Sequence, residues 1–199
     1  MGKAGLAVVP IINGFDPTNP DMIDVYSKAG VSIAVGLYQK LRLEGSECKF
    51  VLTLPELSNA DGAYQHQAAK QFAMSLGVPA SDIEFTTLPN RNAIEDVRSA
   101  AEHCKNYETH LVVFAPEVFR YFRAVIRGVR HQYPKWRITA HVATGTPAAK
   151  PRLRRIYFLL GLATAIAAIT GPTFRLFAAI RRWLDRGRLK QWTRTLEEE

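Results

Sequence analysis

The chain has 199 residues, is 47% hydrophobic and carries a formal net charge of +8. This length supports one substantial hydrophobic core, so we expect one domain with an appendage rather than two full domains. The only two cysteines, Cys48 and Cys104, exclude a disulfide framework and a cysteine-rich zinc site, and we predict no metal site.

Positive charge is concentrated in the last quarter of the chain. Residues 150–199 contain 11 Lys and Arg against 4 Asp and Glu, whereas residues 1–149 contain 15 against 14. This asymmetry is typical of a tail that meets a polyanionic surface, and we expect an anionic membrane surface as its partner. Nucleic acid is disfavoured, because the apolar run in the same tail has no role in binding it. A solvated basic helix without a partner is the alternative.

The N-terminal segment predicts a buried strand. Residues 5–12, GLAVVPII, form a short apolar run that lacks the length and cleavage pattern of a secretory signal, so we expect the domain in the cytoplasm. The turn-rich segment NGFDPTNP follows. Apolar residues at helical spacing then predict a helix over 21–44 that ends at Gly45.

The rest of the first 148 residues alternates between strands and helices. We predict strands over 48–54, 82–88, 109–115 and 137–143, and helices over 60–76, from Asn90 or Asn92 onward, and over 117–132. Gly77 supplies the left-handed cap of the second helix. The alternation predicts an α/β fold with a doubly wound, mainly parallel five-stranded sheet of Rossmann-like or flavodoxin-like type. We assign residues 1–148 to this domain and residues 149–199 to a helical appendage.

The loops after the predicted strands contain the candidate ligand-binding residues, because ligands of parallel sheets bind beyond the carboxyl ends of the strands. For a small-molecule ligand these candidates are Asn13, Gly14, Asp16, Asn90, Asn92, Glu95 and Arg120. The arginine and helix-end amides would hold a phosphate or carboxylate, and a carboxylate side chain would supply acid–base chemistry. Turns and helix caps need the same residue types, so each side chain also has a purely structural interpretation.

Diagnostic catalytic motifs are missing from the chain. It contains no GxGxxG, GxxxxGK[ST], GxSxG or HExxH pattern, which disfavours the usual dinucleotide, nucleoside-triphosphate, serine-hydrolase and zinc-protease chemistries. The sequence identifies neither a catalytic residue nor a cofactor, and it leaves open whether the protein is an enzyme.

Several segments within residues 5–146 follow the order and spacing of a known bacterial group. They are AVGLY, LGVP before an Ile-containing strand, NRNAIEDV, and HLVVFAPEVFRYFRA, at residues 34–38, 76–79, 90–97 and 110–124. In these segments the chain resembles the YdcF/SanA-like family, whose shared domain is of unknown function. The resemblance implies a Rossmann-like core, an envelope-related role and a pocket for an anionic or sugar-linked ligand, with Asn92, Glu95 and Asp96 as retained polar positions.

The chain also departs from this family pattern. Gly30 or Val31 stands where the family has an Arg, TLPE replaces a Gly-Gly after the second strand, Gln65 replaces a Glu and Ala93 a Thr. The resemblance therefore implies a divergent member that has lost much of the family's ligand-binding equipment.

The segment from Ile156 to Phe174 contains 19 residues without a charge, about the minimum for a membrane-spanning helix. Its glycines, proline and threonines bring the free energy of membrane insertion close to zero. A single crossing would also place the following arginines outside the cytoplasm, contrary to the positive-inside rule. We therefore predict a helical hairpin that turns at Gly171-Pro172. Its second helix is amphipathic, with a basic side and an apolar side.

A basic amphipathic helix that contains Trp suits a phospholipid interface. The candidate membrane-facing residues are Phe158, Leu162, Phe174, Phe177, Ile180, Trp183, Arg181 and Arg182. In the alternative, the hairpin packs on the α/β domain or forms a homo-oligomer interface, and its arginines are solvated.

These patterns favour a small-ligand or envelope-precursor binding module that works at the inner face of the cell membrane. The alternative is a soluble enzyme that acts on a phosphorylated or sugar-nucleotide substrate and uses the C-terminal helices as a dimer interface.

Overall fold

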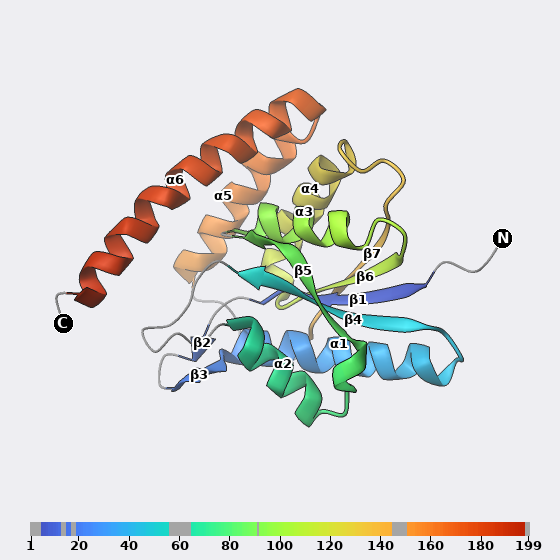
Figure 1. Cartoon of the computed structure of the whole chain (residues 1–199). Helices are drawn as coiled ribbons and strands as arrows, with labels where there is room; N and C mark the ends of the chain where they lie inside the picture. The colour runs from blue at the N-terminus through green and yellow to red at the C-terminus, as the bar shows by residue number, and fades with distance from the viewer. Residues whose placement is uncertain are drawn as a thin grey trace.

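A five-stranded, entirely parallel sheet forms the centre of the protein (Figure 1). The computed structural model describes residues 5–12, 15–16, 19–55, 65–90, 92–144 and 151–197. The strands are β1 (Leu6–Pro10), β4 (Cys48–Pro55), β5 (Ile83–Asn90), β6 (Glu108–Val113) and β7 (Arg137–Val142), and their order across the sheet is β5-β4-β1-β6-β7. The central strand β1 is a short apolar run of the kind that parallel sheets bury on both faces, whereas β7 lies at the edge and is partly exposed.

Helices cover both faces of the sheet. The helices α1 (Val25–Leu43) and α2 (Gln65–Ser75) lie on one face, and α3 (Ala93–His103) and α4 (Pro116–Arg130) lie on the other (Figure 1). The chain builds β1, β4 and β5 in one direction and then returns to add β6 and β7 beside β1. This is the Rossmann-like order rather than the flavodoxin-like one, and it confirms the predicted α/β class.

Two hydrophobic cores lie on the two sides of the sheet. The side chains of Phe50 and Leu52 point toward α1 and α2, whereas Leu111, Phe122 and Trp136 belong to the core beneath α3 and α4. Both cysteines are buried, and burial raises the pKa of Cys48 to about 11 and that of Cys104 to about 12. They are core side chains rather than reactive thiols.

The start of the first helix differs from the prediction. Instead of beginning at residue 21, α1 begins at Val25, because β3 (Asn19–Ile23) pairs antiparallel with β2 (Phe15–Asp16). Asp24 caps α1 by accepting a 2.7 Å hydrogen bond from the Ser27 amide. The predicted helix ends are confirmed at Gly45 and Gly77, which have φ angles of +78° and +95°.

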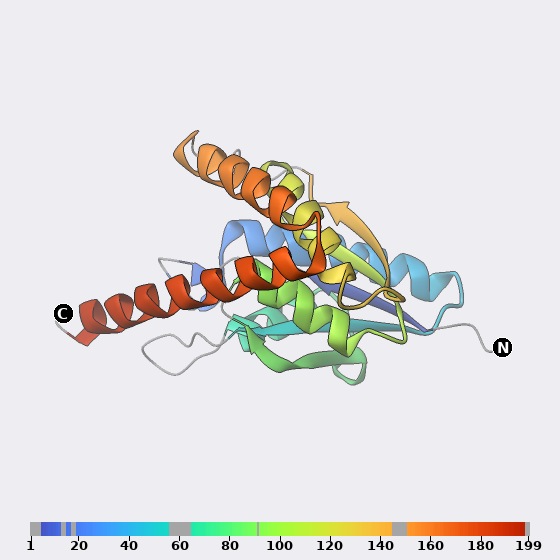
Figure 2. The same cartoon turned by 90° about the horizontal axis from the view of Figure 1, so that it is seen from above.

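Residues 151–197 form the predicted helical hairpin. Helix α5 (Pro151–Ala167) lies along α4, and α6 (Gly171–Glu197) turns back after a short bend, close to the predicted Gly171-Pro172 turn. The two helices diverge along their length, so that α6 extends away from the α/β body (Figure 2). Within the described part of the chain, no helix combines the length and apolarity needed to cross a bilayer.

Phe174 packs the hairpin against the α/β domain. The prediction that Phe174 faces the membrane is therefore wrong. Its ring is 0% exposed and packs over Gly128 of α4, in the same core as Phe122 and Trp136. The amphipathic pattern placed Phe174 on the apolar side of α6 correctly, but the hydrophobic core of the protein covers that position. Phe177 is partly buried against the same core.

Gly128→Ala is expected to lower the free energy of unfolding by about 1–2 kcal/mol. A Cβ atom at this position would lie 2.2 Å from the Phe174 ring, so the overpacking exceeds the gain in helix propensity. Gly36→Ala on α1 is the matched control, because no atom lies within 4 Å of its added Cβ, and it should stabilise the protein by about 0.5–1 kcal/mol. Urea denaturation measures both, and equal effects at the two positions would contradict this packing.

Candidate functional site

Asn92 begins α3 at the carboxyl end of β5. Its side-chain oxygen accepts hydrogen bonds from the amides of Ile94 and Glu95 at 3.0 and 3.1 Å. These bonds satisfy two of the amide groups that a helix start leaves without an intrahelical partner. The predicted cap is confirmed, and capping accounts for the polarity of Asn92 without a ligand.

Glu95 lies in the first turn of α3 and is nearly buried, with 7% of its surface exposed. Its carboxylate accepts a hydrogen bond from the Nε group of Arg182 on α6 and forms an ion pair with it. The predicted ligand residue and the predicted membrane-facing arginine therefore bind each other across 87 positions of sequence. In this structure Arg182 contacts the α/β body, which corrects its assignment to the membrane-facing set.

A small cavity of about 260 Å³ lies beside this ion pair, between α3, α4 and α6. Its basic lining comes from Arg98, Arg175 and Arg182, and Glu95 is its acidic group. Arg181 is partly buried on the same stretch of α6 and is likewise not fully available to a membrane. The ion pair between Glu95 and Arg182 connects α6 to the N-terminal end of α3.

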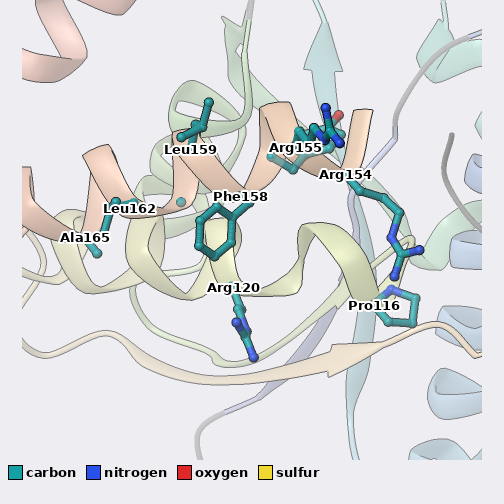
Figure 3. A pocket seen from close by; sticks show the side chains of 10 residues that line it. Pro116, Arg120, Arg154, Arg155, Phe158, Leu159, Leu162 and Ala165 are labelled. Atoms are coloured by element: carbon teal, nitrogen blue, oxygen red, sulfur yellow. The ribbon is translucent and has the colours of Figure 1, made fainter. Parts of the chain in front are cut away.

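Arg120 takes part in a different site, a groove between α4 and α5 (Figure 3). The groove has a volume of about 760 Å³ and is lined by Pro116, Arg120, Arg154, Arg155, Tyr157, Phe158, Leu159, Gly161, Leu162 and Ala165. We call it the basic groove. Arg154 and Pro116 lie at one end of it, Phe158 lies above Arg120, and Leu162 and Ala165 lie at the other end (Figure 3).

The walls of the basic groove follow from close helix packing. Gly161 of α5 lies directly against α4, where a Cβ would make an ordinary van der Waals contact with the Tyr121 backbone nitrogen at 3.5 Å. The rings of Tyr121 and Tyr157 meet at 6.1 Å between centroids. Burial and, to a smaller degree, the Asp24 carboxylate raise the pKa of Tyr157, so its phenol stays neutral.

The structure thus divides the predicted ligand site between two places. Glu95 and Asn92 lie at the start of α3, whereas Arg120 lies with two arginines of α5. Asp16 ends β2 and Asn90 ends β5, and only their backbones are described. The predictions for Asn13 and Gly14 fall outside the described residues. Sequence reasoning assigned Arg154 and Arg155 only to a basic tail; their position beside Arg120 requires the α4–α5 packing.

The hairpin also exposes a large apolar surface. Of the fifteen large hydrophobic side chains that are exposed within the described residues, nine belong to α5 and α6 and a tenth, Ile169, lies in the bend between them. We call these ten the outer apolar surface: Ile156, Phe158, Leu159, Leu162, Ile166, Ile169, Leu176, Ile180, Trp183 and Leu184. This set includes four of the predicted membrane-facing residues, Phe158, Leu162, Ile180 and Trp183. So many exposed apolar side chains on one hairpin are typical of a binding surface rather than of ordinary solvent-facing helices.

Two histidines contact each other on the α1 face of the sheet. His110 Nδ1 lies 3.0 Å from His141 Nε2, and the two rings are stacked. The pKa of each ring is lowered below its ordinary value, mainly because the ring is partly buried. The pair is neutral near pH 7, with one ring donating a hydrogen bond to the other. Nowhere in the described chain do three His, Cys, Asp or Glu side chains gather closely enough to hold a metal ion.

These features define a Rossmann-like α/β protein with a C-terminal helical hairpin that carries a basic groove and an outer apolar surface. Comparison with protein-family models, with curated proteins and with solved structures found no match.

Proposed function

We propose that the protein is a peripheral membrane protein, which binds an anionic lipid surface through the α5–α6 hairpin and presents its α/β domain at that surface. The observation that carries the proposal is the outer apolar surface, which the protein's own core leaves uncovered. The side chain of Phe158 is 59% exposed and that of Trp183 is 71% exposed. Aromatic rings of this kind favour the boundary between lipid headgroups and acyl chains.

Charge supports an anionic lipid as the partner. The excess of seven positive charges in residues 150–199 belongs to the same segment as the outer apolar surface. Helices that combine basic and apolar side chains bind the bilayer interface through both buried area and attraction to anionic headgroups. The cytoplasmic leaflet carries such headgroups, so the inner face of the cell membrane is the proposed location.

The α/β domain is the proposed binding module for a small ligand related to the cell envelope. The resemblance to the YdcF/SanA-like family supports this part, as does the Rossmann-like sheet, in which the start of α3 lies beyond the carboxyl end of β5.

Vesicle flotation tests the membrane proposal. The full chain should float with vesicles of mixed phosphatidylcholine and phosphatidylglycerol, and much less with phosphatidylcholine alone. Rising salt should weaken the binding but not abolish it, because screening removes the electrostatic part and leaves the apolar part. A protein that stays unbound with both vesicle types at low salt would overturn the proposal.

Sedimentation of the same protein samples measures the oligomeric state and tests the dimer alternative. If the chain is a stable dimer without lipid, and truncation after residue 149 yields a monomer, the outer apolar surface is a protein–protein interface. A monomeric full chain that floats with anionic vesicles supports the membrane proposal.

A further inference from the structure

The basic groove has the chemistry of a site for one amphiphilic molecule. Three arginines line it together with the side chains of Phe158, Leu162 and other apolar residues. Arg154 lies beside Pro116 at the end where α4 begins, Arg120 lies below Phe158, and the opposite end toward Leu162 and Ala165 is apolar (Figure 3). A ligand that matches this order has an anionic head and a hydrocarbon chain.

The arginines of the groove have no competing anion among the described side chains. Arg120, Arg154 and Arg155 are all exposed, and none forms an ion pair with a carboxylate in the described part of the chain. Arg182, in contrast, is paired with Glu95. Like charges gathered without a counter-charge repel one another, and a bound phosphate would relieve that repulsion.

The start of α4 adds to the positive potential at this end. Pro116 is its first residue and lines the groove, and the N-cap residue Ala115 supplies no side-chain acceptor to the helix. The positive end of the helix dipole therefore points toward the arginines. The dipole only strengthens the site, because the arginines and the groove are the primary observations.

We infer that the basic groove binds a single phosphate-bearing lipid, with the phosphate at Arg120, Arg154 and Arg155 and the acyl or isoprenoid chain along Phe158 and Leu162. This inference rests on the proposed function and specifies it: the hairpin attaches to the membrane, and the groove takes up one lipid molecule from it. The rest of the outer apolar surface, such as Trp183 and Ile180, lies outside the groove.

Binding of dodecyl phosphate, below the concentration at which it forms micelles, tests the inference without a bilayer. Isothermal titration calorimetry should show saturable binding of one molecule per protein. Arg120→Gln and Arg154→Gln should each weaken dodecyl phosphate binding about tenfold, because each removes one charge-assisted hydrogen bond at a surface site. Phe158→Ser should weaken it as well, because it removes the apolar wall.

Arg123→Gln is the matched control, since Arg123 is an exposed arginine of the same helix that lies over the Phe119 ring and does not line the groove. It should leave the affinity unchanged, and thermal unfolding should be the same for all three arginine variants. If Arg123→Gln weakens binding as much as Arg120→Gln does, the inference fails.

Three further ligands test the two halves of the proposed lipid. Dodecyl maltoside carries the chain without the charge, and inorganic phosphate and glucose 1-phosphate carry the charge without the chain. If dodecyl maltoside binds as tightly as dodecyl phosphate, the groove is only an apolar cleft. If glucose 1-phosphate binds as tightly, the site recognises soluble phosphates and the lipid inference is wrong.

Failure of this inference is distinguishable from failure of the membrane proposal. If the wild-type protein floats with anionic vesicles but does not bind monomeric dodecyl phosphate, the proposed function is supported and the groove site is ruled out. If the protein binds dodecyl phosphate at the arginines but does not float, the groove site is supported and the membrane attachment is ruled out.

Discussion

Replacing Ile180 and Trp183 together with aspartate is expected to weaken binding to anionic vesicles by about 100-fold. Both side chains are exposed on α6 and belong to the outer apolar surface. Their burial in the lipid interface contributes roughly 1.5 kcal/mol each, and a loss of about 3 kcal/mol corresponds to that factor. The two new carboxylates add repulsion from the anionic headgroups. Vesicle titration followed by centrifugation measures the change in partition coefficient.

Leu43→Asp with Met74→Asp is the matched control. These side chains are also exposed, at 88% and 43%, but lie on α1 and α2 across the sheet from the hairpin. The pair makes the same change in net charge and should keep nearly wild-type binding. All four positions face solvent, so neither double variant should change the free energy of unfolding by more than about 0.5 kcal/mol per substitution. Equal loss of binding in the two variants would show that net charge, and not the hairpin, governs attachment.

Arg182→Met is expected to lower the free energy of unfolding by about 1–3 kcal/mol. The Glu95 carboxylate is nearly buried and would lose its arginine partner, which leaves charge in a poorly solvated position. Because the Arg182 side chain is 39% exposed, solvent screening reduces the cost below that of a fully buried pair. The double variant with Glu95→Gln should recover part of the loss, giving a coupling energy of about 1 kcal/mol or more.

The exposed Lys40–Glu44 pair is the control for this cycle. These side chains are separated by 4.0 Å on α1 and are both largely solvated, so their coupling should be only about 0.3–0.5 kcal/mol. Denaturant unfolding of both sets of variants gives the two coupling energies. Hydrogen exchange adds a local measure, since loss of the Glu95–Arg182 pair should increase amide exchange in α6 more than in α1. Equal coupling in the two cycles would contradict a structural role for the Glu95–Arg182 pair.

Local sequence patterns were sufficient to predict most elements of the α/β domain. Short runs rich in apolar and β-branched residues predicted all five strands of the sheet, and Gly77 and Asn92 predicted a helix end and a helix start. These signals depend on neighbouring residues only, which is why they can be read without a tertiary structure. The β2–β3 pair was missed because it consists of a few polar and proline-containing residues without an alternating pattern.

The hairpin shows where local patterns stop being informative. Periodicity predicted two helices and a turn near Gly171, but α6 has apolar side chains on more than one side. Its sequence does not say which of them the domain will cover. Packing of α6 over Gly128 buries Phe174 and leaves Trp183 exposed, and this choice depends on the shape of α4.

The amino-acid sequence by itself determined the order of strands and helices, their caps and the basic, apolar character of the last fifty residues. Only the tertiary structure decided that Glu95 pairs with Arg182 and that Arg120 joins Arg154 in one groove. The reason is physical: helix and strand signals arise from interactions over a few residues, whereas these contacts join positions that only the packing of α5 and α6 on the domain brings together.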